Sequence, residues 1–135
     1  MSRQAARENA FLFLYQIEIQ KDHVEKQREN FLENFSMDPA DEAFFDELVH
    51  GVCDKKEWLD ERISEYLRKW TVDRIPKVDL TILRIAVYEL YFATDVPPNV
   101  AISEAVILSR KYSDEDARSY INAVLGNIFR AKEES

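Results

Sequence analysis

The stretch Val78 to Ala93, VDLTILRIAVYELYFA, decides the fold of this chain. Asp79 is a suitable N-cap, and apolar or aromatic residues fill nearly every position after it. A helix that is apolar on almost every side is typical of one surrounded by other helices. The stretch is too short for a confident membrane span, and Arg84 and Glu89 interrupt it. We therefore predict a central, buried helix in a helical domain that does not enter a membrane.

The composition is that of one globular domain rich in helix. The chain has 135 residues, enough to bury a substantial core, and 46% of them are hydrophobic. Two glycines and four prolines provide few hairpin turns, which argues against a strand-rich fold. Cys53 is the single cysteine, so no internal disulfide can form. The polar start MSRQAAREN is unlike a signal peptide, which predicts a cytoplasmic protein.

Further helices are predicted on both sides of the central one, because apolar residues recur at helical spacing. Asp38 and Pro39 give the clearest start, an N-cap followed by proline at the first helical position. Asp54 and Glu57 form a capping-box pattern before the fourth helix, and Ser113 is the expected cap of the last. The first helix is expected between Ser2 and Lys21 and the second between Val24 and Phe35, and the fourth carries Trp70 on its inward face. Pro98 or Asn99 is expected to open the sixth helix, and the last should end near Ala131.

These elements predict an all-α fold of about seven helices, arranged as two small bundles that share a core. We expect a single domain, with an N-terminal helical subdomain over residues 1–70 and a C-terminal one over residues 71–135.

No set of residues predicts catalysis. His50 and Cys53 are three residues apart and can share a helix face, but they lack a third group to orient them. A core thiol beside a partly exposed histidine is the preferred explanation of the pair. Neither His23 nor His50 lies in a metal-ligand cluster, and glycine-rich phosphate loops are absent. We predict a protein that is not an enzyme and uses no metal or cofactor.

The net charge of −8 is unevenly distributed. Residues Asp22 to Glu61 hold thirteen acidic and four basic residues, so the rest of the chain is close to neutral. An acidic, solvated face explains most of these carboxylates without any partner. Local basic patches elsewhere can still contact phosphate groups.

Three blocks of sequence are specific enough to indicate a family: DRIPKVDLTILRIAVYEL from residue 73, DVPPNVAISEAVILSRKYS from residue 95 and YINAVLGNI from residue 120. With Arg3, Arg7 and Leu14-Tyr15 near the N-terminus, these blocks resemble the NusB family of bacterial transcription antitermination factors. The resemblance implies two three-helix subdomains. It also implies binding of boxA RNA together with the ribosomal protein NusE, in a complex with RNA polymerase that transcribes ribosomal RNA operons. Asn122-Ala123 and Ile102-Ser103-Glu104 depart from the usual family motifs.

The candidate RNA-binding residues lie near the starts of two helices. Arg3 and Arg7 can pair with phosphates at a helix N-terminus, although solvation alone explains two terminal arginines. Tyr120 occupies the aromatic RNA-contact position of the family and could stack on a base, or else be a half-buried core tyrosine. The full candidate set is Arg3, Gln4, Arg7, Asp116, Arg118, Ser119, Tyr120 and Asn122, with Arg110 and Lys111 as neighbouring basic residues.

The acidic character favours a basic partner, which the resemblance identifies as NusE. Tyr15, Asp73 and Asp79 lie at positions compatible with its contact surface. Arg84 is expected to form a structural ion pair with Glu89 or Glu104, because an unpaired buried charge is very costly. A helical protein–protein adaptor is the main alternative function. A fragment of an RNA-modifying enzyme is a weaker alternative, and a homodimer is possible.

Overall fold

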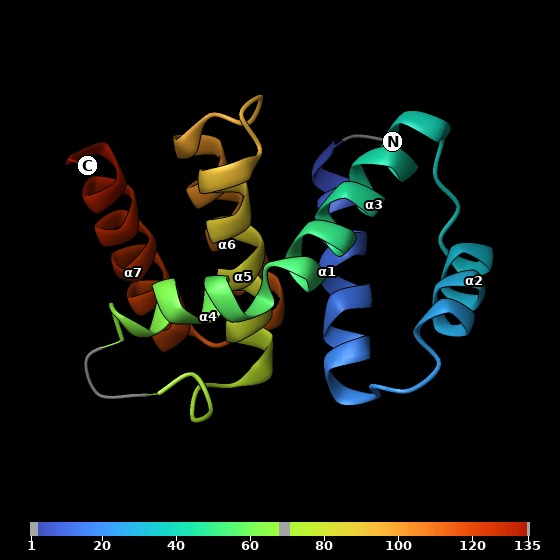
Figure 1. Ribbon diagram of the computed structural model, residues 1–135, viewed down its shortest axis with the longest axis horizontal. Helices are drawn as coiled ribbons and strands as arrows, with labels where there is room; N and C mark the ends of the chain where they lie inside the picture. The colour runs from blue at the N-terminus through green and yellow to red at the C-terminus, as the bar shows by residue number, and fades with distance from the viewer. Residues whose placement is uncertain (1–2, 68–70, 135) are drawn as a thin grey trace.

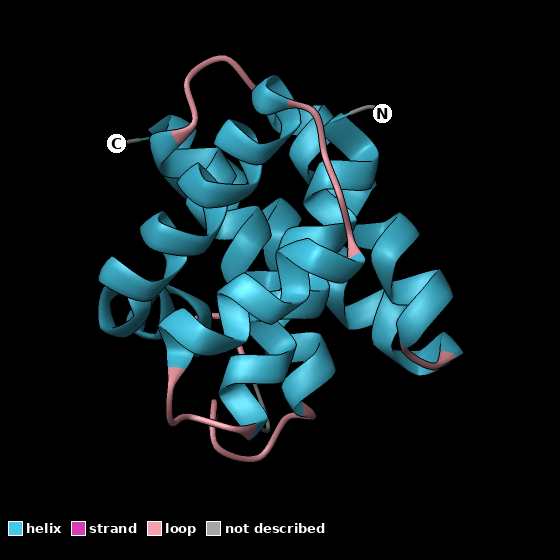
Figure 2. Cartoon of the chain, turned by 90° about the vertical axis from the view of Figure 1, so that its right-hand side faces the viewer, coloured by secondary structure: helices cyan, strands magenta, loops and turns pink. Residues whose placement is uncertain are grey.

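The computed structural model describes residues 3–67 and 71–134, which form seven α-helices and no strand (Figures 1 and 2). The predicted all-α fold is confirmed. The helices are α1 (Arg3–Ile19), α2 (Val24–Asn34), α3 (Pro39–Asp54), α4 (Lys56–Ser64), α5 (Lys77–Phe92), α6 (Pro98–Tyr112) and α7 (Glu115–Glu134). Ser2 and Trp70, for which a cap and an inward position were predicted, lie outside the described residues.

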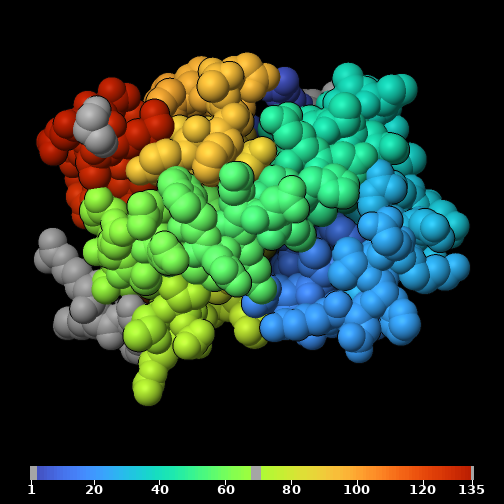
Figure 3. Space-filling view, viewed as in Figure 1, coloured from blue at the N-terminus to red at the C-terminus, as the bar shows by residue number. Residues whose placement is uncertain are grey.

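The helices form two groups joined along α5. Helix α1 packs against α2 and α3, whereas α5, α6 and α7 pack against one another (Figure 1). Helix α4 contacts α3, α5 and α7, and it lies across the middle of the face seen in Figure 3. The packing therefore associates α4 with the C-terminal helices as well, although it belongs to the N-terminal half of the sequence. Helices α1 and α3 also contact α5, so the two groups share one core.

The predicted central helix is α5. Every residue from Asp79 to Leu90 is buried, and Ile82, Leu83 and Val87 have no exposed surface. The helix begins at Lys77, two residues before the expected N-cap. The prediction that Asp79 caps it is wrong, because Pro76 takes the N-cap position and its carbonyl accepts the hydrogen bond from the amide of Leu80 at 3.0 Å.

Two further predicted helix starts can be compared with the structure. The Asp38 cap is confirmed, since its carboxylate accepts from the Asp41 amide at 2.9 Å. The capping box at Asp54 is wrong, because α3 continues through Asp54 and α4 follows one residue later with no side-chain cap. Only Lys55 separates the two helices, which leaves no room for a capping turn.

The start of α7 is displaced by one residue from the prediction. Asp114, and not Ser113, accepts the hydrogen bond from the backbone amide of Ala117, at 3.0 Å. Ser113 ends α6, and its hydroxyl bonds to Asp79. This leaves the Ser113 side chain free to join the end of α6 to α5.

Gly51 allows α3 to lie against the ring of Tyr88 on α5. A Cβ atom at this position would lie 2.2 Å from Tyr88 Cζ, far inside van der Waals contact. Gly126 on α7 is different, because the nearest atom to a Cβ there would be Nη1 of the flexible Arg130 side chain, at an ordinary contact distance of 3.5 Å.

We expect Gly51→Ala to destabilise the protein by about 1–3 kcal/mol, because the methyl group must displace a buried ring. Gly126→Ala is the matched control and should be neutral or stabilising by up to about 1 kcal/mol through its helix propensity. Urea unfolding followed by circular dichroism measures both changes. Equal effects of the two substitutions would contradict the close approach at Gly51.

Candidate nucleic-acid interface

Arg7 is buried between α1, α5 and α6. Its Nε and Nη2 atoms donate to the two carboxylate oxygens of Glu89, each at 2.8 Å, and Nη1 donates to Glu104 at 3.0 Å. Its exposed fraction is 4%, so the guanidinium faces the interior. This placement is at odds with the predicted phosphate contact of Arg7. Sequence periodicity could not reveal it, because Glu89 and Glu104 lie far along the chain.

The charges around Arg7 stabilise one another. Burial lowers the pKa of Arg7, but the hydrogen bonds and charges of Glu89 and Glu104 outweigh burial and leave the pKa above its ordinary value. Bidentate contact with Glu89 is the strong geometry for an arginine and a carboxylate. Arg7 is therefore a structural link between the first helix and the core.

Arg3 and Gln4 remain exposed at the start of α1. The Arg3 guanidinium pairs with Asp95 at 2.8 Å and lies over the Phe44 ring, 4.7 Å from its centroid. Gln4 Nε2 donates to Glu104 at 3.3 Å. The carboxylates that pair with these side chains, Asp95 and Glu104, are exposed and partly exposed, so solvent or a ligand can reach them.

A second group of predicted residues lines one open, polar hollow between α6 and α7. We call it the α6–α7 groove; its volume is about 660 Å³. The lining residues are Val106, Arg110, Glu115, Asp116, Arg118, Ser119 and Asn122. The structure thus brings together four of the predicted RNA-binding residues and adds Arg110. The four predicted residues share the groove because they follow one another on the first turns of α7, whereas Arg110 reaches it from α6.

The two basic residues of the groove differ in their surroundings. Arg118 pairs with Glu115 at 3.4 Å, one turn away on the same helix. Arg110 is exposed, and no carboxylate in residues 3–67 or 71–134 forms an ion pair with it. Arg110 is consequently the groove cation that an incoming phosphate could reach without first breaking an ion pair.

Tyr120 is partly buried and does not line the groove. Its hydroxyl donates to Asp79 Oδ2, and Ser113 Oγ donates to Asp79 Oδ1 at 2.5 Å. Burial and the neighbouring Asp79 raise the pKa of Tyr120, so its hydroxyl remains a donor at neutral pH. Asp79 is 2% exposed, which is at odds with the direct partner contact predicted for it.

The other two residues predicted to contact a partner are more accessible. Tyr15 is partly exposed and stacks on Phe11 with ring centroids 6.3 Å apart, and Asp73 is exposed before α5. Their contact with a partner stays a prediction.

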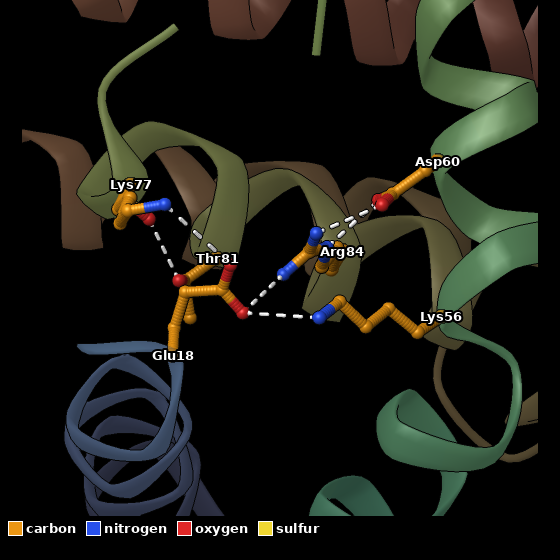
Figure 4. Close-up of polar contacts among 6 residues, drawn as sticks. All are labelled: Glu18, Lys56, Asp60, Lys77, Thr81 and Arg84. Carbon is orange, nitrogen blue, oxygen red and sulfur yellow. Dashed lines mark hydrogen bonds and ion pairs between the residues drawn. The ribbon is translucent and has the colours of Figure 1, made fainter. Parts of the chain in front are cut away.

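Arg84 forms a second buried charge cluster (Figure 4). It donates to both oxygens of Asp60 on α4, at 2.7 and 2.8 Å, and to Glu18 on α1 at 3.1 Å. The prediction of an ion pair is confirmed, but the predicted partners, Glu89 and Glu104, are wrong because both bind Arg7. Lys56 and Lys77 lie 3.4 and 3.8 Å from Glu18.

His50 and Cys53 are both exposed, and among the described residues no hydrogen bond joins them. The interpretation of Cys53 as a core thiol is therefore wrong. Although its side chain reaches the surface, desolvation by the surrounding protein raises the pKa of the Cys53 thiol, which leaves less thiolate at neutral pH. The described part of the chain holds no group of three His, Cys, Asp or Glu residues placed to bind a metal ion. It likewise has no helix with the length and apolar character needed to cross a bilayer.

Comparison with known proteins gives one consistent result. The model of the NusB family matches residues 4–130. The transcription antitermination protein NusB of Acetivibrio thermocellus is 42% identical over 132 residues, covering 98% of this chain and 91% of that protein. Its counterpart from Bacillus subtilis is 42% identical over 128 residues, covering 95% of each.

Solved structures show the same similarity. NusB of T. maritima has a TM-score of 0.86 and 31% identity, covering 96% of this chain and 92% of that one. A NusB chain in a structure of antitermination factors NusB and NusE with double-stranded RNA has a TM-score of 0.87 and 28% identity, covering 96% of both chains.

We expect Arg7→Ala to destabilise the fold by about 3–5 kcal/mol, because Glu89 would remain buried without its partner. Arg3→Ala removes an exposed pair from the same helix and should change the stability by less than about 1 kcal/mol. Chemical unfolding of both variants measures the difference. Similar stability of the two would show that the Arg7 network contributes little.

We also expect acid to weaken the Arg84 cluster. Burial raises the pKa of Glu18, but Arg84 and Lys56 outweigh it and bring the pKa below its ordinary value of 4.5. A carboxyl group with a lowered folded-state pKa stabilises the protein above its unfolded pKa and loses this contribution as the pH falls through its folded pKa. The free energy of unfolding should therefore fall between about pH 5 and pH 3.

Urea unfolding at a series of pH values tests whether the free energy of unfolding falls as the pH is lowered. Glu18→Gln should reduce the pH dependence, whereas Glu33→Gln, at an exposed position on α2, should leave it unchanged. An unaltered pH profile for Glu18→Gln would rule out Glu18 as a contributor to the acid sensitivity.

Proposed function

The chain belongs to the NusB family, and from this membership we propose that it is an RNA-binding transcription antitermination factor. It binds boxA RNA as a heterodimer with the ribosomal protein NusE. The complex joins RNA polymerase in the cytoplasm and supports processive transcription of ribosomal RNA operons. The protein acts by binding and catalyses no reaction.

The α6–α7 groove is the observation that carries the RNA-binding proposal. It is open and polar, and it combines two arginines with carboxylate, hydroxyl and amide groups. Arginines suit phosphates, while Ser119 and Asn122 can bond to sugar and base edges. Single-stranded RNA is recognised by this mixture of charge and hydrogen-bonding groups.

Helix α6 extends the surface from the groove to the start of α1. Arg110 faces the groove, and its neighbour Lys111 lines a separate hollow that also includes Gln4 and Glu104. Arg3 begins α1, directly before Gln4, and the positive end of a helix dipole favours an anion at such a position. An RNA strand crossing α6 can contact both groups.

The scarcity of free cations supports the need for a partner. Arg3, Lys111 and Arg118 are paired with Asp95, Glu8 and Glu115, respectively. Each pair must loosen before its cation can contact a phosphate, so the chain alone binds RNA weakly and with strong salt dependence. NusE, docking near Tyr15 and Asp73, adds the missing basic surface. A NusB chain of similar structure occurs with NusE and RNA, which supports this arrangement.

The pairing of these basic side chains with carboxylates of the same chain also favours a second candidate function. This is a helical adaptor that binds proteins but recognises no RNA sequence. The two candidates differ in one property. An adaptor should not distinguish boxA RNA from RNA of the same composition in scrambled order.

Fluorescence anisotropy with labelled boxA and scrambled RNA, with and without NusE, tests the proposal. We expect selective binding to boxA that tightens when NusE is present. Arg110→Ala should weaken it and reduce the steepness of the log affinity–log salt plot by about 0.7, the value for one lost phosphate contact on a single strand. Arg130→Ala is the matched control on α7, outside the groove. Equal binding of both RNAs at every salt concentration would exclude sequence-specific recognition and favour the adaptor.

A further inference from the structure

The joint between α6 and α7 is held by three hydroxyl groups. Tyr112 donates to Glu8 on α1, while Ser113 and Tyr120 donate to the two oxygens of Asp79 on α5. Ser113 ends α6 and Tyr120 lies in the second turn of α7, so the two Asp79 contacts bracket the first turn of α7.

Asp79 is built into the core at this point. Its side chain is in the first turn of α5 and is 2% exposed. Each carboxylate oxygen accepts one hydroxyl, and both donors come from the same short segment. A buried carboxylate with both oxygens used in this way fixes the distance between its two donors.

The segment that Asp79 holds carries most of the α6–α7 groove. Glu115, Asp116, Arg118 and Ser119 all lie between Ser113 and Tyr120, and all four line the groove, whereas Tyr120 does not. A rotation or fraying of the first turns of α7 would move these groups relative to Arg110 on α6. The hydrogen bonds from Ser113 and Tyr120 to Asp79 on α5 oppose this movement.

We propose that Asp79 is a positioning residue for RNA binding, which orients Tyr120 and the start of α7 so that the groove presents its arginine and polar groups together. This inference rests on the RNA-binding function proposed above. It also gives Asp79 a role that its burial permits, in place of direct contact with a partner. The effect of Asp79 on RNA passes through the Ser113 and Tyr120 hydroxyls.

A carboxylate is required at this position because two hydroxyls donate to it. Asparagine has nearly the same shape but only one acceptor oxygen, so Asp79→Asn leaves Ser113 or Tyr120 without an acceptor. Tyr120→Phe removes one donor and keeps the aromatic ring. Both substitutions therefore weaken the pair of hydrogen bonds by which Asp79 holds the start of α7.

The test compares RNA affinity in Asp79→Asn, Tyr120→Phe and the double variant, at a temperature where all are folded. Each single variant should bind boxA RNA about three- to tenfold more weakly, the effect of one lost hydrogen bond. The double variant should be weakened by less than the product of the single effects, because either single change already frees the same segment at the start of α7. Asp60→Asn is the control: it makes the same chemical change at the Arg84 cluster and should lower stability without lowering RNA affinity.

Hydrogen exchange provides a measurement that needs no RNA. The backbone amides of residues 115–120 should exchange faster in Asp79→Asn than in the unmodified protein and the Asp60→Asn control. If exchange and RNA affinity are unchanged in both Asp79→Asn and Tyr120→Phe, the proposal is overturned. Purely additive losses in the double variant would overturn it too.

Failure of the two proposals can be told apart. If the unmodified protein with NusE does not prefer boxA RNA, the proposed function fails, and the positioning role for RNA fails with it. If the unmodified protein does prefer boxA RNA and the Asp79 variants bind it equally well, only the role of Asp79 is wrong. Tyr120→Phe keeps the test decisive even if Asp79→Asn does not fold.

Discussion

Two buried arginines set the arrangement of this protein, because each must be neutralised inside the core. Arg7 on α1 binds Glu89 on α5, and Arg84 on α5 binds Glu18 on α1. A later residue of α1 thus meets an earlier residue of α5, so the pairs fix an antiparallel register between the two helices. Apolar packing alone tolerates small shifts along a helix, whereas a displaced ion pair leaves a buried charge unpaired. The few polar positions of the apolar helix α5 therefore determine where α1 rests on it.

Ion pairs within the chain also determine which cations on the protein surface are available to a ligand. Cations that could have met phosphate groups are bound to carboxylates of the same chain, and Arg110 stands apart from them at the α6–α7 groove. Sequence specificity then depends on where hydroxyl, amide and carboxylate groups lie more than on total charge. A rigid frame is useful for this purpose, because weak contacts discriminate between ligands only when their geometry is fixed.

Features that depend on neighbours in the sequence could be predicted from the sequence. The helices, the buried character of α5 and the Asp38 cap follow from periodicity and local hydrogen bonding. The grouping of Asp116, Ser119 and Asn122 also follows, since they lie on one helix. Pairings across the core could not be predicted: a buried arginine requires a carboxylate, but several carboxylates are available and only packing selects Asp60 and Glu18 for Arg84. For the same reason, Arg7 and Asp79 seemed accessible in the sequence and are buried in the fold.

The long reach of the Arg7 contact has a consequence for the order of folding during synthesis. Arg7 and Glu89 are separated by 82 positions in the chain. The ribosome must therefore have released the whole of α1 to α5 before the first helix can find its charged partner. Until then α1 can pack against α2 and α3 but not against α5. The Arg7 guanidinium remains unpaired with Glu89 on the face of α1 that α5 later covers. Contacts this distant in sequence make folding slower. Here Glu89 on α5 and Glu104 on α6 must both be made before Arg7 on α1 has its full set of carboxylate partners.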